Sequence, residues 1–398
     1  MSEPAPEPAP PPTGRELYSH VRLDLPNVRS QRTTPSNARL ALGVVCMTKK
    51  PTCIITWLTH HRSLGVSKVY LRIEDTPELA ALLTQPPWDE IVEAQYASGT
   101  QPHYTEQTSR QNAHVAWALP RARRAGITHL LHIDDDELLY CSLGFEALLS
   151  DLATSPRDAC DLHLSNLEAY APSWACASPY AEVRVFRHDK DTFGAYCNGK
   201  SIGRVSAPNL RSLGPHGFYF DGARERYDVP ACIGVILHYE SILFSAWERK
   251  FAALAASHAA GRHSSGAPTY YVQSMDAMAD VESARATGDA DGLKQAQAAA
   301  ARLWEQWRLQ PPAVAAAVIA EVEATGVPRV LACGLTVVRP LAPEIAALES
   351  SVEEAAAAGP EVEIVSLAGQ ERAPSLRLPA LCIGRRVVRG TWRTRVCV

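Results

Sequence analysis

The sequence predicts an α/β protein whose main sheet is largely parallel. Two observations lead to this prediction. Short apolar runs begin near Leu40 and recur at 66–73, 91–96 and 130–133, and amphipathic helical patterns lie between them. Strands separated by helices form βαβ units, in which neighbouring strands run parallel.

The first two helices have recognisable ends. Pro51 stands at a first helical position, apolar residues recur on one face through 54–64, and Gly65 is a typical residue to end a helix. Thr76 and Pro77 have the pattern of a helix start, so they open a short second helix. Both helices therefore connect strands of the predicted sheet.

A longer helix is predicted at 105–125, with Pro120 kinking it or ending its first part. The strand at 130–133 then leads directly into the acidic run 134–137. Beyond it the pattern becomes richer in strands and ends in two alanine-rich helices. The expected strands are centred on 162–164, 182–186, 201–205 and 232–238, and the expected helices on 243–260 and 290–309.

The chain divides into three parts by composition. Residues 1–36 are rich in proline and lack periodicity, so we interpret them as a flexible leader. Residues 37–310 form the main domain. A second shift near Pro311 precedes a small α/β unit at 328–398, with its own strands, helix and final hairpin.

Composition excludes several classes of function. A net charge of −4 provides no basic excess for binding nucleic acid. No apolar run has the roughly 20 residues of a membrane helix, and the proline-rich start lacks the pattern of a signal peptide, so we expect a cytoplasmic protein. The ten cysteines form no CxxC pair and no zinc spacing, which indicates reduced thiols.

The acidic run at 134–137 is the strongest candidate for a functional site. Ligands bind at the carboxyl ends of strands in such sheets, and this run follows a strand directly. In an extended segment Asp134 and Asp136 would point to one side, where two carboxylates suit Mn²⁺ or Mg²⁺. The alternative is an acidic turn that only caps the following residues.

Five fragments resemble glycosyltransferase family 92 and family 2-like enzymes of GT-A fold, and they occur in the same order along the chain as in those enzymes. The acidic run within His-Ile-Asp-Asp-Asp-Glu-Leu-Leu is similar to their DxD signature, and Gly-Lys-Ser-Ile-Gly-Arg and Leu-His-Tyr-Glu-Ser are similar to two later motifs. The chain departs from the family at Thr48–Lys50, at Glu74–Thr76 and at Val205. The matching fragments are 54–71, 110–113, 132–139, 199–204 and 237–241.

The resemblance implies a metal-dependent transfer of a sugar from a nucleotide diphosphate sugar, a UDP-sugar first, to a hydroxyl of a glycan or glycoconjugate. It implies that the metal, Mn²⁺ or Mg²⁺, is held by Asp134 and Asp136, and that His238, or alternatively His216, completes the metal or phosphate site. The residues that it places near the donor nucleotide and its phosphates are Asp75, Arg110, Lys200 and Arg204. Each of these also has a plainer interpretation, such as an exposed strand face for Lys200 and Arg204.

An inverting reaction needs a carboxylate that accepts the proton of the acceptor hydroxyl. The candidates are Glu168, Glu182, Asp221 and Glu240, and the resemblance places Glu168 and Glu182 on the acceptor side. Two other functions stay open at this point. One is a degenerate transferase that serves as a binding or scaffold module. The other is a metal-dependent phosphohydrolase or nucleotidyltransferase that uses the same carboxylates.

The ending Pro-Ala-Leu-Cys-Ile-Gly at 379–384 resembles a small thioredoxin-like domain. The redox CxxC is absent, with Val338–Leu341 near its place, so no dithiol exchange is expected. The resemblance implies a docking or dimerisation unit, and the chain could form a homo-oligomer through it. The alternative is an unrelated α/β appendage.

Overall fold

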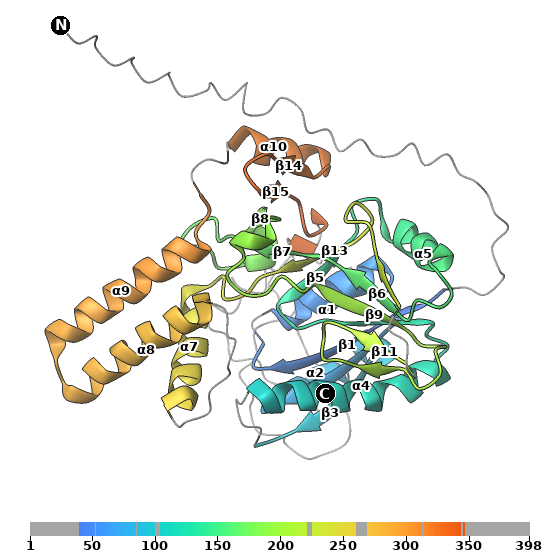
Figure 1. The fold of residues 1–398 in the computed structure, drawn as a ribbon, viewed down its shortest axis with the longest axis horizontal. Helices are drawn as coiled ribbons and strands as arrows, with labels where there is room; N and C mark the ends of the chain where they lie inside the picture. Colours follow the sequence, from blue (N-terminus) through green and yellow to red (C-terminus); the bar gives the residue numbers. More distant parts are fainter. Residues whose placement is uncertain are drawn as a thin grey trace, which may run out of the picture.

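The computed structural model describes residues 40–346, apart from 52, 85, 100–103, 221–224, 260–268, 312, 313, 315 and 344. Within this range the fold is mixed α/β, with parallel and antiparallel strands (Figure 1). The predicted leader 1–36 and most of the predicted unit at 328–398, with its 379–384 ending, lie outside the described residues.

A seven-stranded sheet forms one half of the structure, in the order β12-β6-β9-β4-β1-β2-β3. All neighbours run parallel except β9, which is antiparallel to both β4 and β6. The carboxyl ends of β4 and β6 therefore lie beside the amino end of β9. The strands are β1 (Leu42–Lys49), β2 (Lys68–Glu74), β3 (Val92–Ala97), β4 (His129–His132), β6 (Asp161–Leu164), β9 (Lys200–Arg204) and β12 (Arg226–Asp228).

A second sheet has six strands in the order β14-β15-β8-β7-β13-β5. The chain passes from the first sheet to the second at residues 133–136, between β4 and β5. A short hairpin, β10 (Arg211–Ser212) with β11 (Phe218–Tyr219), forms a two-stranded sheet of its own. The second sheet consists of β5 (Glu137–Tyr140), β7 (Asn166–Ala169), β8 (Val185–Arg187), β13 (Val235–His238), β14 (Arg329–Leu331) and β15 (Leu335–Val337).

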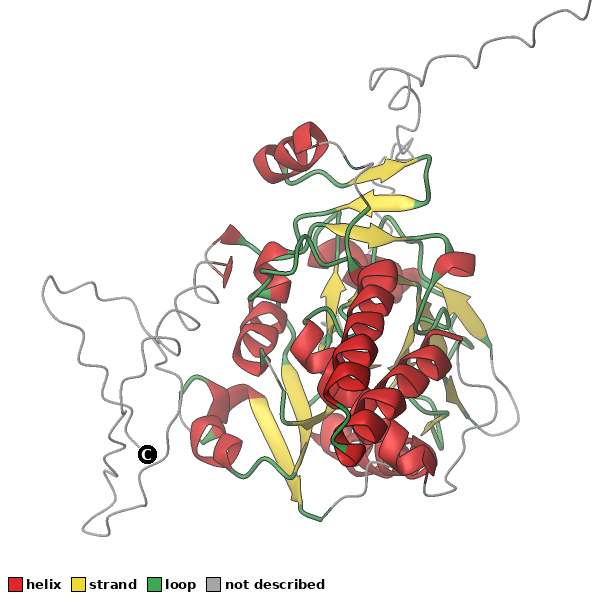
Figure 2. Ribbon diagram, turned by 90° about the vertical axis from the view of Figure 1, so that its left-hand side faces the viewer, coloured by secondary structure: helices red, strands yellow, loops and turns green. Residues whose placement is uncertain are grey.

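Helices cover the sheets, and α7, α8 and α9 extend away from them as an arm (Figures 1 and 2). The described helices are α1 (Ile54–Leu64), α2 (Glu78–Leu83), α3 (Trp88–Ile91), α4 (Tyr104–Arg124), α5 (Phe145–Thr154), α6 (Pro179–Glu182), the 3-10 helix η1 (Lys190–Thr192), α7 (Phe244–Ala259), α8 (Thr269–Thr287), α9 (Ala290–Arg308) and α10 (Ala316–Thr325). No helix among the described residues has the length and apolar character needed to cross a membrane.

Strand β1 shows why the sheet reads as a continuous apolar run. Val44 and Cys46 pack into one core with α1, while Val45 packs into a second core with α4 on the opposite face. A strand buried on both faces needs apolar residues at every position. Gly65 ends α1 with a φ of +110°, as its identity predicts.

The predicted elements before residue 134 are confirmed within a few residues, with one detail resolved. Pro120 does not end α4, which continues as a helix to Arg124. Helix α8 was not among the predicted elements, although both of its alanine-rich neighbours were. Its sequence is mixed in polarity, so it lacks the clear apolar stripe that marks a surface helix.

The residues after 328 that the structure describes pack on the main body. Strands β14 and β15 form an antiparallel hairpin that turns at Gly334, where φ is +82°. Strand β15 pairs with β8 of the second sheet, and Leu341 and Ile345 join the main core. The predicted boundary at 328 therefore does not separate residues 329–346 from the main body, because β14 and β15 are strands of the second sheet. The thioredoxin-like character of the unit at 328–398 stays a prediction.

The packing of 329–346 can be tested at Leu341. The change Leu341→Ala removes a buried side chain from the main core, so the free energy of unfolding should fall by about 2–5 kcal/mol. Urea denaturation followed by tryptophan fluorescence measures this, since every tryptophan except Trp392 lies within 57–307. The matched control Val327→Ala alters a side chain that is 57% exposed and should change stability by less than about 0.5 kcal/mol. An unchanged value for Leu341→Ala would contradict the packing described here.

Candidate functional site

The acidic run lies where the two sheets meet. Strand β4 ends at His132, Asp135 and Asp136 form a turn, and β5 begins at Glu137. The extended geometry expected for 134–137, with Asp134 and Asp136 on one side, is therefore wrong. The chain turns here because it leaves one sheet to enter the other, and the side chains separate into distinct environments.

Lys200 organises the first of these environments. It is fully buried at the start of β9, and its ammonium contacts Asp134 and lies 3.1 Å from Oε2 of Glu137. Gln111 Nε2 donates to Asp134 Oδ1 at 2.9 Å, and the Asp134 amide donates to Glu137 Oε2 at 2.9 Å. Asp134 is thus held by a cation and an amide from two other elements.

The pKa values follow from burial and from this cation. Loss of hydration raises the pKa of Asp134, but the charge of Lys200 and its hydrogen bond outweigh it and lower the pKa to about 2. Burial raises the pKa of Glu137 to about 7 despite Lys200, because the charges of Asp134 and Asp136 add to it. The pKa of Lys200 is raised, since these carboxylates outweigh its burial.

Asp135 points elsewhere. Thr48 Oγ1, near the end of β1, donates to Asp135 Oδ2 at 2.5 Å, and the Tyr180 hydroxyl donates to the Asp135 carbonyl at 2.7 Å. Burial, with the nearby charge of Asp136, raises the pKa of Asp135 to about 7. These contacts fix the middle of the turn between β1 and α6.

Asp136 faces the second sheet, where His238 ends β13. His238 Nε2 lies 3.7 Å from Asp136 Oδ2 and 3.8 Å from Glu240 Oε2. One ligand atom from each of the three residues lies within 4.8 Å of the other two. Burial lowers the pKa of His238, but the hydrogen bond and the charge of Asp136 raise it by more than burial lowers it, so the net shift is upward.

This trio of Asp136, His238 and Glu240 fits a divalent metal by its chemistry, because carboxylate oxygens and an imidazole nitrogen are ligands of Mn²⁺ and related ions. Glu240 also accepts hydrogen bonds from Lys250 at 2.7 Å and from the Tyr271 hydroxyl at 3.1 Å, both on Oε2. An ion would therefore share Glu240 with Lys250 and rely most on the other two ligands. The predicted ligands Asp136 and His238 come together, whereas Asp134 lies with Lys200.

Asp75 and Arg110 lie near the carboxyl end of β2. Arg110 Nε donates to Glu74 Oε1 at 2.9 Å, and Asp75 accepts from the Gly99 amide at 2.6 Å. Asp75 also pairs with Lys49 at 2.8 Å. The structure thus brings both predicted nucleotide contacts to one place, beside the acidic turn but not within it.

The two cations of β9 have different partners. Lys200 holds the acidic turn, whereas Arg204 at the other end donates to the Ala159 carbonyl at 3.0 Å and to Ser155 Oγ at 2.8 Å. Strand β9 is an inner strand between β4 and β6, so it presents no edge to solvent. A phosphate contact of Arg204 stays a prediction, and its observed contacts anchor the loop after α5.

Glu168 is buried and forms ion pairs with two arginines. It lies 3.1 Å from Arg308 and 3.2 Å from Arg187, and it accepts the amides of Gly194 and Ala195 at 2.7 Å each. Burial raises the pKa of Glu168, but the two arginines and the amide bonds lower it below its ordinary value. This environment favours a structural carboxylate that stays ionised.

Glu182 is exposed, and its carboxylate accepts hydrogen bonds from the backbone that leads into α6. Its Oε1 accepts the amides of Ala177 and Ser178 at 2.8 Å each. Of the other two candidate bases, Glu240 belongs to the trio above and Asp221 lies outside the described residues. The catalytic roles of Glu168 and Glu182 stay predictions.

Sequence reasoning missed several residues of the site. Gln111 was part of a matched fragment, and Glu137 was part of the acidic run, but neither was given a partner. Lys250 and Tyr271 carry no signal, because they come from α7 and α8 and meet Glu240 only through the packing of the arm.

Part of the chain is similar in sequence to a glycosyltransferase-like protein. No protein-family model matches the chain. A glycosyltransferase-like protein of Arabidopsis thaliana is 25% identical over 207 residues, which cover 42% of this chain and 46% of that protein. The chain thus spans about half the length of this relative. Two structures of HddC from Yersinia pseudotuberculosis, one complexed with GMP-PN, are 12% and 9% identical, cover 50% of this chain and 78% of theirs, and have TM-scores of 0.22 and 0.23. Scores this low support no conclusion about fold.

The structural role of Glu168 can be tested by Glu168→Gln. Removing the charge leaves Arg308 and Arg187 without their carboxylate, so the free energy of unfolding should fall by about 3–5 kcal/mol in urea denaturation. The matched control is Glu282→Gln, which breaks an exposed pair with Arg285 on α8 and should cost less than about 1 kcal/mol. Equal, small losses in the two variants would contradict the assignment.

The same pair predicts a pH dependence. Because folding lowers the pKa of Glu168, its ionisation stabilises the fold above the unfolded pKa of about 4.3. That stabilisation is lost as the pH falls through the lower, folded pKa. The stability difference between wild type and Glu168→Gln should therefore be full at pH 7 and shrink below about pH 4.

Proposed function

We propose that the protein is a metal-dependent glycosyltransferase. It would move a sugar from a nucleotide diphosphate sugar, a UDP-sugar first, to a hydroxyl of a glycan or glycoconjugate, with inversion. The observation that carries the proposal is the trio of Asp136, His238 and Glu240 beside an acidic turn at the carboxyl edge of the parallel strands. The glycosyltransferase-like relative supports the same reaction class.

Asp136, His238 and Glu240 would hold Mn²⁺ or Mg²⁺. A divalent ion bound there supplies positive charge for the diphosphate that leaves. Lys250 lowers the pKa of Glu240 against the effect of burial, so Glu240 stays ionised, and the ammonium of Lys250 offsets the charge of that carboxylate. The remaining anionic ligand, Asp136, is partly exposed and so open to a ligand.

Lys200, Asp134 and Glu137 position the turn. Their contacts fix where Asp136 stands relative to β13, since Glu137 faces His238 across β5 and β13. Asp134 would act through this arrangement and through its partly exposed carboxylate, which lies beside the region of Asp75 and Arg110. We place the donor nucleotide at those two residues, near the end of β2.

The transfer itself needs one proton acceptor. The acceptor oxygen forms a bond to the anomeric carbon of the sugar, the bond from that carbon to the diphosphate breaks, and the hydroxyl proton passes to a carboxylate. Between the two predicted bases the structure favours Glu182, because it is exposed while Glu168 is buried under two arginines.

A thermal shift assay with Mn²⁺ and a panel of nucleoside diphosphates tests this proposal. One diphosphate should stabilise the protein only with metal, by about 2.7 kcal/mol at 100 times its Kd. Asp136→Asn and His238→Gln should each lose this effect, because each removes a ligand of the ion. The matched control Asp276→Asn, an exposed aspartate on α8, should keep it.

The outcomes separate the alternatives. Stabilisation in Asp136→Asn equal to that of wild type would contradict the metal assignment. No response of wild type to any diphosphate would favour a scaffold without donor binding. Release of inorganic phosphate from the nucleotide would favour a phosphohydrolase.

A further inference from the structure

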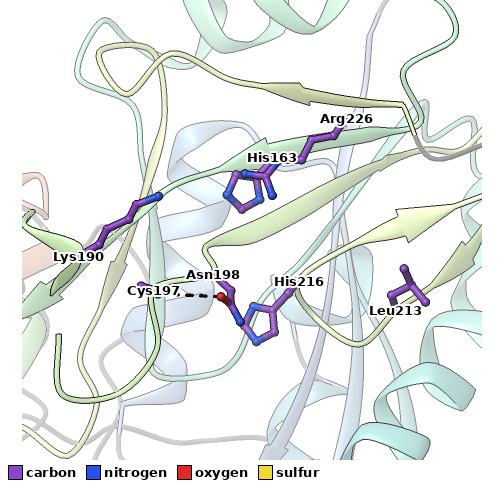
Figure 3. A pocket seen from close by; sticks show the side chains of 7 residues that line it. All are labelled: His163, Lys190, Cys197, Asn198, Leu213, His216 and Arg226. Atoms are coloured by element: carbon purple, nitrogen blue, oxygen red, sulfur yellow. Dashed lines mark hydrogen bonds between the residues drawn. The ribbon is translucent and has the colours of Figure 1, made fainter. Parts of the chain in front are cut away.

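A cavity of about 510 Å³ lies beside the acidic turn and is not used by the metal or the nucleotide as placed above. Its size falls within the roughly 300–1,000 Å³ of small-molecule sites. Figure 3 shows its side chains converging from several segments, among them β6, η1 and the loop before β9. The lining residues are His163, Lys190, Cys197, Asn198, Leu213 and His216, with Arg226.

Ring contacts connect this cavity with the proposed metal trio. His216, one of its walls, contacts the Gly199 carbonyl through Nδ1 at 2.6 Å, directly before Lys200. The ring of Tyr196 lies 4.8 Å from the ring of His216 and 4.6 Å from the ring of His238, centroid to centroid. The ring of Tyr196 therefore lies between the His216 wall of the cavity and His238, a proposed metal ligand.

The order of the strands places the cavity on the acceptor side. Asp75 and Arg110 are near the end of β2, the acidic turn follows β4, and the cavity lies by β9, β6 and β12. In this order the acidic turn stands between the nucleotide region and the cavity. A donor spread from β2 to the turn would thus present its sugar toward the cavity.

The lining has an unused polar atom. His163 is 1% exposed, and its Nδ1 has no hydrogen-bond partner among the described residues. The Nε2 edge of the ring packs against Gly199, where an added Cβ would lie 2.6 Å from Nε2. Burial, followed by the charge of Arg226, lowers the pKa of His163 to about 4, so the ring is neutral at pH 7 and adds no charge to the lining.

The charge of the lining is positive. Lys190 and Arg226 line the cavity, and its lining includes no carboxylate among the described residues. Arg226 forms an ion pair with Asp228, in which Nη2 lies 2.6 Å from Oδ1. Lys190, on the exposed 3-10 helix η1, is thus the cation more available to a ligand.

We propose that this cavity is the acceptor subsite and that it takes a sugar unit bearing an anionic group, a carboxylate or a phosphate. Lys190 meets the anionic group. The inference rests on the proposed function, because it assigns the acceptor of that transfer. It narrows the acceptor class from any hydroxyl compound to an acidic sugar.

Saturation-transfer NMR on the full chain with Mg²⁺ tests this, with methyl glucoside, methyl glucuronide and glucose 6-phosphate as probes. At least one acidic probe should bind about tenfold more tightly than the neutral one, because its anionic group makes a charge-assisted hydrogen bond with Lys190. The acidic probe that binds identifies the carboxylate or the phosphate. Lys190→Gln should remove this preference, and the control Lys294→Gln, an exposed lysine on α9, should retain it.

Equal binding of the three probes, or a preference that survives in Lys190→Gln, would overturn the inference. A loss of nucleoside diphosphate binding in Lys190→Gln, without loss of the acidic probe, would overturn it as well, because the cavity would then hold the donor. Diphosphate binding to wild type, measured in parallel, separates the two proposals. If it fails while the acidic probes bind, the donor assignment fails and the acidic sugar site stands.

Discussion

The buried ammonium of Lys200 is the constraint on which the site depends. A charge without hydration is too costly in a protein interior unless it is paired, so Lys200 requires Asp134 and Glu137 as neighbours. Those two residues stand on either side of the turn between the sheets. Their pairing joins the start of β9 to the end of β4 and the start of β5, and it gives the acidic run one conformation.

This constraint divides the carboxylates by the partners that they contact. Asp134 and Glu137 compensate Lys200, which leaves Asp136 to face His238 and Glu240. The other buried charges follow the same rule, with Lys250 beside Glu240 and two arginines beside Glu168. Glu240 and Glu168 are thus compensated by cations, and the partly exposed Asp136 stands open to an added ion.

The fold of the first hundred residues of the sheet region could be predicted because its signals are local. Apolar runs and Gly65 depend on neighbours in the sequence, and the structure agrees with them. The direction of the acidic side chains could not be predicted, because it depends on β4 and β5 belonging to different sheets. An alternation rule holds within a strand and fails at a turn.

The partners of buried charges were also beyond sequence reasoning. The resemblance places Glu168 on the acceptor side as a candidate base, yet Arg308 of α9, far along the sequence, pairs with it. Nothing periodic connects such positions, and a carboxylate in the sequence looks the same whether it is free or paired. His238 can be singled out because it ends an apolar strand, which is a local signal, and its role as a metal ligand stays a prediction.

The central claim is that Asp136 and His238 bind a divalent ion together. Electron spin-echo spectroscopy of Mn²⁺ on protein labelled with ¹⁵N-histidine tests it most directly, since it detects a nitrogen bonded to the ion. The account predicts coupling to one imidazole nitrogen in wild type and its loss in His238→Gln. Coordination by oxygen alone in wild type, or nitrogen coupling that persists in His238→Gln, would contradict it.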